Sequence, residues 1–123
     1  MHDLYISRQI AREVIGRARK EGAFRVLEVK VKVGQLTHLN PEQLNFWLRE
    51  FFKNTLAQEA EILIEKTPPL IFCKKCGYRG KLKVEDPYFL YFFPSLQCPR
   101  CRWDKIEISS GRECLLESIK IER

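Results

Sequence analysis

Apolar residues near the start of the chain recur at helical spacing. Between Leu4 and Lys20 an apolar side chain returns every three or four positions, with arginine and glutamate residues between them. This spacing predicts an amphipathic helix that ends before Gly22. The spacing then changes to two, which predicts a strand with one buried face and one solvated face. The apolar positions of that strand are Leu27, Val29, Val31 and Val33.

A second helix is predicted both by the residues at its start and by its apolar face. Asn40 is a good N-cap, Pro41 suits the first helical position, and Gln43 stands where a capping box requires it. We interpret the apolar stripe that follows as core, because a stripe at this spacing normally packs inside the protein. The stripe consists of Leu44, Trp47, Leu48, Phe51 and Phe52.

Two further alternating segments complete the predicted sheet. Residues 60–66 form one strand, which Pro68-Pro69 terminates, and residues 119–122 form another after Gly111. The last strand is too short to be stable alone, so it must join the sheet of the N-terminal part. The sequence therefore predicts an α+β fold, with two helices packed on one face of a three-stranded sheet.

The breaks at the proline pair and before the last strand divide the chain into two parts. We predict that residues 1–68 plus 112–123 form the α+β domain and that residues 69–111 form an inserted module. At 123 residues, the chain has room for one modest core and one small module that a metal ion stabilises.

Four cysteines in two tight pairs lie within the inserted module. Cys73 and Cys76 form one pair, Cys98 and Cys101 form the other, and 21 residues separate the pairs. Both thiolates of such a pair reach one metal ion from a single turn, and two turns complete the tetrahedral set typical of structural Zn(II). Four thiolates leave no open position for water, so we expect a zinc-ribbon module that supports folding. A redox dithiol and two disulfides are the alternatives.

The composition is that of a soluble globular protein, with 45% hydrophobic and 31% charged residues. No apolar run approaches the roughly 20 residues that span a bilayer, and the N-terminus lacks the pattern of a signal peptide. A fifth cysteine, Cys114, leaves an odd number that suits a reducing cytoplasm, and we expect it to be a small buried residue on a late strand. We therefore expect a cytoplasmic protein without a membrane partner.

The net charge of +6 leaves two interpretations of the surface. Four thiolates with one zinc ion reduce the charge to about +4. The basic residues then form either an ordinary solvated surface or a nucleic-acid interface, which zinc ribbons often provide. No nucleophile–base pair, phosphate-binding loop or paired carboxylate motif is visible, so we do not expect an enzyme.

The first three residues have the chemistry of a planar metal site. The Met1 amine, the backbone amides of His2 and Asp3 and the His2 imidazole together supply four nitrogen donors. Such a set suits Ni(II) or Cu(II) better than Zn(II). A frayed terminus is the alternative interpretation of the same residues.

A set of short stretches, taken in order, resembles one known family. The stretches before the cysteines are Met1-His2-Asp3-Leu4, Gly22-Ala23-Phe24-Arg25-Val26, Val33-Gly34-Gln35-Leu36 and Asn40-Pro41-Glu42. Those after the cysteines are Ser110-Gly111-Arg112-Glu113 and Ile119-Lys120-Ile121-Glu122. Together with the paired cysteines they cover nearly the whole chain, which resembles the HypA/HybF family of nickel metallochaperones for nickel–iron hydrogenase maturation.

The resemblance implies a function and a site for each part. Ni(II), a transient cargo, would be held in the domain of residues 1–68 plus 112–123 by the Met1 amine, the His2 and Asp3 amides and the His2 imidazole. Structural Zn(II) would be held by the four paired cysteines. The protein would deliver nickel, with a nucleotide-hydrolysing maturation protein like HypB, to the hydrogenase large-subunit precursor.

The chain departs from the family pattern in two places. Its third residue is Asp3, where family members usually carry glutamate, and the loop between the cysteine pairs is longer and holds five aromatic residues within residues 88–93. That loop either packs the module or docks a partner protein. His38, the only other histidine, is interpreted as a surface loop residue and not as a ligand.

Two other functions stay open from the sequence. A zinc-ribbon nucleic-acid-binding protein would gather its basic residues on one face and bind in a salt-dependent way. A scaffold in hydrogenase assembly would bind no nickel of its own. The returning last strand is compatible with a monomer and with a homodimer that exchanges strands.

Overall fold

The computed structural model describes residues 2–82 and 97–123, and for His2 it describes the backbone only. The aromatic loop at residues 88–93, including its predicted packing or docking role, lies outside the described residues. The chain divides into two compact units. The first comprises residues 1–33, 38–66 and 114–123, and the second comprises residues 34–37 and 67–113.

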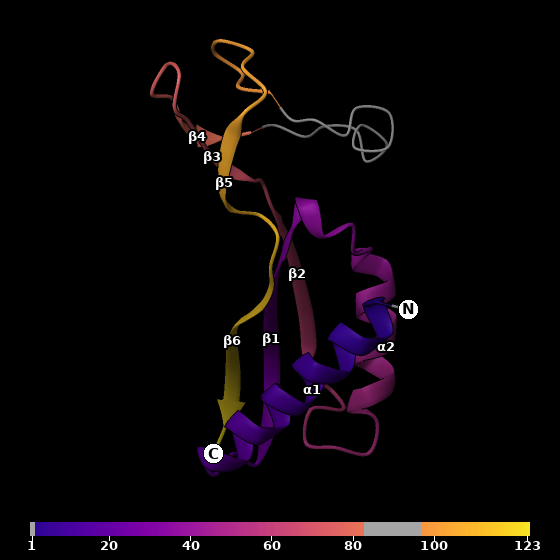
Figure 1. Cartoon of the computed structure of the whole chain (residues 1–123). Helices are drawn as coiled ribbons and strands as arrows, with labels where there is room; N and C mark the ends of the chain where they lie inside the picture. The colour runs from indigo at the N-terminus through magenta and orange to yellow at the C-terminus, as the bar shows by residue number, and fades with distance from the viewer. Residues whose placement is uncertain (1, 83–96) are drawn as a thin grey trace. The chain divides into compact units, whose positions relative to one another are not determined.

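The first unit is a two-layer arrangement of helices on a sheet. Its elements in chain order are α1 (His2–Lys20), β1 (Arg25–Gly34), α2 (Pro41–Phe52), β2 (Glu61–Thr67) and β6 (Cys114–Glu122). The strand order is β2-β1-β6, and β6 pairs antiparallel with β1. Both helices lie against the same face of this sheet (Figure 1). The predicted α+β fold class is therefore confirmed.

The start of α2 is capped as the sequence predicts. The side-chain oxygen of Asn40 accepts hydrogen bonds from the backbone N–H of Glu42 at 2.8 Å and of Gln43 at 3.4 Å. These are two of the donors that a helix start leaves without an intrahelical acceptor. The cap turns the apolar side of α2 toward the core, where Leu44, Leu48 and Phe52 are fully buried.

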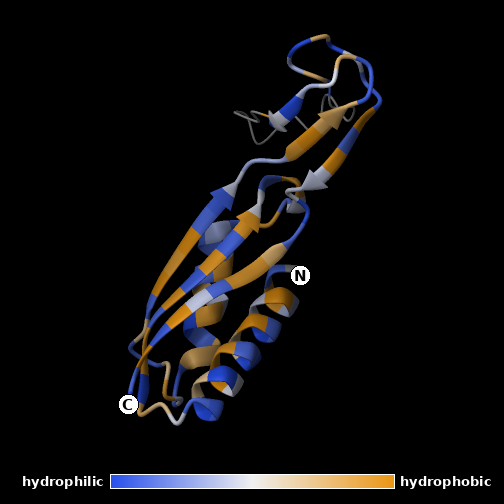
Figure 2. Cartoon of the chain, turned by 90° about the vertical axis from the view of Figure 1, so that its left-hand side faces the viewer, coloured by the Kyte–Doolittle hydropathy of each residue, from blue (hydrophilic) through white to orange (hydrophobic). Residues whose placement is uncertain are grey.

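The core of the first unit combines the apolar faces of both helices with one face of the sheet. Hydrophobic residues (orange) alternate with hydrophilic residues (blue) along its strands in Figure 2. One predicted core residue is exposed. The β1–β6 register shifts between Val26 and Glu28, which moves Leu27 out of phase and leaves its side chain 41% exposed. Val26 is buried in its place, because a bulge reverses the alternation of faces along a strand.

Gly16 is an unusual residue for the middle of α1. An interior glycine destabilises a helix by about 1 kcal/mol relative to alanine, because glycine loses more backbone freedom on folding. A Cβ atom added at Gly16 would meet no atom within 4 Å. The packing of the described residues therefore gives no reason for a glycine here.

The second unit contains a sheet of its own, which the sequence analysis did not predict. The short helix η1 (Gln35–Thr37) belongs to it, as do β3 (Leu70–Cys73), β4 (Arg79–Lys81) and β5 (Ile106–Ser110). The strand order is β4-β3-β5, and both neighbours pair antiparallel with β3. No helix in residues 2–82 and 97–123 is both long enough and apolar enough to cross a bilayer.

Two segments of the second unit, residues 34–37 and residues 111–113, lie close together next to the ends of β1 and β6. The backbone N–H of Gly34 donates to the carbonyl of Glu113 at 2.9 Å, and the N–H of Leu36 donates to the carbonyl of Gly111 at 2.9 Å. The Glu113 carboxylate accepts from the N–H of Gly111 at 3.1 Å. A Cβ atom on Gly34 would overlap the Gly111 backbone, so only glycine fits at this position.

Gly34→Ala is expected to destabilise the protein by about 1–3 kcal/mol or more, because the added methyl group meets backbone that cannot rotate away. Gly16→Ala makes the same chemical change in open space and is expected to stabilise it by about 1 kcal/mol. Urea unfolding of both variants, followed by circular dichroism, measures the two free energies. Equal stability of the two variants would contradict the close approach at Gly34.

Candidate metal centre

The first cysteine pair lies on a tight turn that begins where β3 ends. The backbone N–H of Gly77 donates to the carbonyl of Cys73 at 2.8 Å, and the N–H of Cys73 donates to the carbonyl of Tyr78 at 2.9 Å. Gly77 has a φ of +78°, in the left-handed region that glycine adopts without strain. The turn thus places Cys73 and Cys76 on the same side of the backbone.

The second cysteine pair lies on a turn with the same hydrogen-bond pattern. The N–H of Arg102 donates to the carbonyl of Cys98 at 2.8 Å, and the N–H of Cys98 donates to the carbonyl of Trp103 at 2.8 Å. Arg102 has a φ of +64° and takes the left-handed position that Gly77 takes in the first turn. The two turns are therefore local copies of one geometry.

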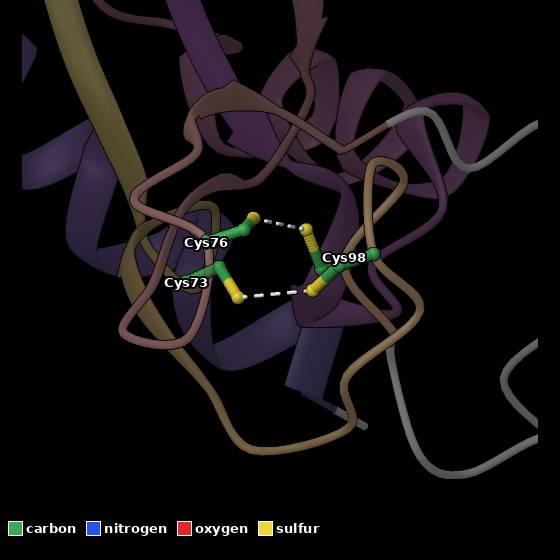
Figure 3. A group of neighbouring side chains, drawn as sticks. Cys73, Cys76 and Cys98 are labelled. Atoms are coloured by element: carbon green, nitrogen blue, oxygen red, sulfur yellow. Dashed lines mark hydrogen bonds between the residues drawn. The ribbon is translucent and has the colours of Figure 1, made fainter.

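The sulfur atoms of the two turns face one another (Figure 3). The Sγ atoms of Cys73 and Cys101 lie 3.5 Å apart, and those of Cys76 and Cys98 lie 3.6 Å apart. All four sulfurs lie within 4.8 Å of one another. A disulfide requires about 2.05 Å between sulfurs, and all five cysteines are free. A tetrahedral zinc site with bonds of about 2.3 Å needs sulfurs roughly 3.8 Å apart. The four residues therefore fit a single tetrahedral metal ion.

Backbone N–H groups and burial set the protonation of the cluster. The N–H of Cys76 lowers the pKa of Cys73. Burial raises the pKa of Cys98, but N–H donors, first that of Cys101, outweigh it and bring the pKa to about 7. The N–H of Trp103 lowers the pKa of Cys101, yet burial and the three other sulfurs raise it to about 12. Some thiolate therefore forms near neutral pH, whereas the last proton leaves only when a cation binds.

The N-terminal residues of the predicted nickel set lie at the start of α1. The helix begins at His2, so the backbone amides of His2 and Asp3 belong to its first turn. One carboxylate oxygen of Asp3 accepts a hydrogen bond from the backbone N–H of Asn40 at 3.1 Å. The start of α1 is thereby connected to the N-cap of α2. Met1 and the imidazole of His2 lie outside the described part.

Cys114 lies near this end of the first unit. It is the first residue of β6, it is half-buried, and its side chain packs against the hydrophobic core. Burial, and after it the negative charge of Asp3, raise the pKa of the Cys114 thiol to about 11. Cys114 is therefore a neutral thiol at neutral pH. It lies on the last strand, as predicted, but it is half-buried rather than buried.

His38 is an exposed residue in the loop between η1 and α2, with a φ of +60°. The prediction of a surface loop histidine is confirmed. The left-handed conformation of Arg102 and the hydrogen bond from Asn40 to Asp3 were not predicted from the sequence. The first had a usable signal, because Arg102 follows its cysteine pair as Gly77 follows the other.

The fold and the cluster define a class of protein, an α+β domain that carries an inserted four-cysteine ribbon. The family model described as "Hydrogenase/urease nickel incorporation, metallochaperone, hypA" matches residues 1–121. The chain therefore belongs to the HypA family, whose members are metallochaperones of nickel incorporation.

Curated relatives and solved structures agree with this family. The hydrogenase maturation factor HypA of Methanothermobacter thermautotrophicus is 40% identical over 123 residues and covers 100% of this chain and 98% of that protein. The hydrogenase maturation factor HypA of Pyrococcus horikoshii is 35% identical, with coverage of 100% and 97%. The solution structure of the nickel metallochaperone HypA from Helicobacter pylori has a TM-score of 0.60 at 18% identity, with coverage of 94% and 97%, and therefore supports the fold alone.

Proposed function

We propose that this chain binds Ni(II) at its N-terminus and delivers it to the hydrogenase large-subunit precursor. The nickel donors are the Met1 amine, the backbone nitrogens of His2 and Asp3 and the His2 imidazole. The observation that carries the proposal is the start of α1 at His2, in a chain of a nickel-incorporating family. The nickel ion is cargo, bound at one end of a helix where a second protein can reach it.

The position of the two amides in the first helical turn supports this donor set. N–H groups in the first turn have no intrahelical acceptor, so losing their protons breaks no hydrogen bond within α1. The hydrogen bond from Asn40 to the Asp3 carboxylate holds this turn against α2 while leaving the Asp3 nitrogen free of that contact. The donors are thus partly positioned before nickel binds, which reduces the entropy lost on binding.

The dipole of α1 favours one charge state of the nickel site over another. The positive end of a helix disfavours a bare cation and favours negative charge. Two deprotonated amides supply two negative charges, which balance the charge of Ni(II) and make the filled site neutral. The dipole therefore favours a site built from amide anions over one built from neutral donors.

For the four-cysteine cluster we propose structural Zn(II), held by Cys73, Cys76, Cys98 and Cys101. Two observations support a closed, tetrahedral site: the separation of the sulfurs, and a donor cluster that, within residues 2–82 and 97–123, consists of cysteines alone. When bound, zinc supplies folding free energy to the second unit, and it performs no reaction.

A nucleic-acid-binding ribbon is the second candidate function, and contacts within the second unit count against it. The Lys74 ammonium lies 2.9 Å from the Glu107 carboxylate, and Lys75 lies over the Trp103 ring at 4.7 Å. Arg79 lies over the Phe72 ring at 4.7 Å. The Glu107 carboxylate offsets the charge of Lys74, and the two rings hold Lys75 and Arg79 against the chain, so fewer cations are free to reach phosphates.

Nickel incorporation requires other maturation proteins, since the metal must come from one protein and pass to another. We propose that the chain exchanges nickel with a nucleotide-hydrolysing maturation protein of the HypB type before delivery to the precursor. A site at the end of a helix suits such an exchange, because a partner can supply donors while the first set releases the metal.

Adding a Gly-Pro pair before Met1 is expected to abolish tight nickel binding. The Met1 amine becomes an amide, and the proline nitrogen beside it has no proton to lose, so no run of chelate rings joins the new terminus to His2. In the native chain, affinity is expected to fall below about pH 8, and more steeply below about 6.5, as the amine and imidazole become protonated. Calorimetric Ni(II) titration of native and extended chains between pH 8.5 and pH 5.5, at roughly unit steps, tests both effects.

Zinc content, measured in parallel, serves as the control and is expected to stay at one equivalent in the extended chain. If the extended chain binds nickel as tightly as the native one, the donors are side chains elsewhere. His38→Ala is then the first variant to titrate.

A further inference from the structure

One exposed row of α1 carries positive charge along the whole helix. Its members lie three or four positions apart, so they share one side of the helix, and all of them are exposed. The row lies opposite the buried face that includes Val14 and Ala18. With a rise of 1.5 Å per residue, it extends for about 21 Å. This arginine row consists of Tyr5, Arg8, Arg12, Gly16 and Arg19.

The charge of the arginine row has no counterpart nearby in the described part of the chain. Arg17, on a different side of α1, is paired with Glu13, and Arg25 is paired with Glu122. Among residues 2–82 and 97–123, the ion pairs within 4 Å include none made by Arg8, Arg12 or Arg19. Arg8 and Arg12 are one helical turn apart and repel each other, so the free chain gains no electrostatic stability from this pair.

Gly16 supplies an independent observation at the centre of the row. The helix would be more stable with alanine there, and the surrounding space would accept the methyl group. Because Gly16 has no side chain, the helix backbone is bare at the centre of the row, and a second protein element can approach it more closely there than at any other residue type.

We infer that the arginine row docks an acidic face of the partner protein that exchanges nickel with this chain, an inference that rests on the proposed function. Tyrosine and arginine are among the residue types that contribute most to protein–protein binding energy. Tyr5 is 62% exposed and therefore accessible to a partner. The row begins in the helical turn that follows the N-terminal donors, so a docked partner lies beside the cargo. Nucleic acid fits less well, because a phosphate backbone gains nothing from the bare backbone at Gly16.

The test measures binding of the full chain to the purified nucleotide-hydrolysing maturation protein at about 50 and 300 mM NaCl. Arg8→Gln combined with Arg12→Gln is expected to weaken binding by about tenfold at low salt and by less at high salt. Gly16→Gln is expected to weaken it by about tenfold at both, since the added side chain blocks close approach. Arg17→Gln is the matched control and should change affinity by less than about twofold.

Two measurements on the free variants keep the result unambiguous. Gly16→Ala and Gly16→Gln are expected to raise the apparent Tm by a few degrees, about 4–8 °C for alanine, which excludes misfolding as the cause of weaker binding. Nickel titration of every row variant is expected to match the native chain, so a failure of nickel binding and a failure of docking are read separately.

Binding of the double arginine variant within twofold of the native chain overturns the inference, as does a native chain that does not bind this partner. A duplex oligonucleotide that loses affinity with the double variant, while the protein partner does not, also overturns it and assigns the row to nucleic acid.

Discussion

Cys76→Ser is expected to release the metal ion and unfold the second unit while the first unit stays folded. Structural zinc contributes about 10–16 kcal/mol of apparent binding free energy, which is most of the folding free energy of a small module. In its described residues, the second unit has a three-stranded sheet, the short helix η1 and tight turns to replace that contribution. Metal analysis is expected to fall from one equivalent of zinc to near zero.

Cys114→Ser is the matched control, because Cys114 is also a cysteine but lies outside the cluster. It is expected to keep a full equivalent of zinc. Far-UV circular dichroism of Cys76→Ser should retain the helical signal, since α1 and α2 both belong to the first unit. A full equivalent of zinc in Cys76→Ser would contradict the four-thiolate site.

His2→Ala is expected to lower nickel affinity by more than about 100-fold without changing the fold. The His2 imidazole is the only side-chain donor in the proposed planar set, and a backbone amide in its place would first have to lose a proton. Calorimetric Ni(II) titration measures the loss, and thermal unfolding checks that stability is unchanged. His38→Ala is the matched control, because it removes an exposed imidazole elsewhere in the same unit. Unchanged nickel affinity in His2→Ala would remove the N-terminal assignment.

The helices and strands of the first unit could be predicted because each has a single apolar spacing, three to four residues in the helices and two in the strands. The cap at Asn40 was predictable because capping is also local: the Asn40 side chain bonds to backbone N–H groups only two and three positions away. Leu27 was predicted wrongly because a bulge depends on the partner strand β6, which lies some 90 residues later in the chain. Strand pairing at that distance leaves no local pattern.

The metal centre was predictable in composition but not in geometry. Cysteine spacing alone indicates which residues can share a metal ion, because the turn that joins each pair is short. The sheet of the second unit escaped prediction because β4 has only three residues, too few to show a period. The hydrogen bond to Asp3 joins residues 37 positions apart and depends on how α1 packs on α2.

The pairing of β1 with β6 has a consequence for synthesis of the chain. The strand that completes the first sheet follows the cysteine turns in the chain, so β1 waits with one edge unpaired while those turns are synthesised. An unpaired strand rich in valine is a template for aggregation. A chain that ends before Cys114 would keep both helices and all four paired cysteines, yet it would leave this edge permanently open. Truncations that remove β6 are therefore expected to destabilise the first unit, although most of that unit comes from the N-terminal half of the chain.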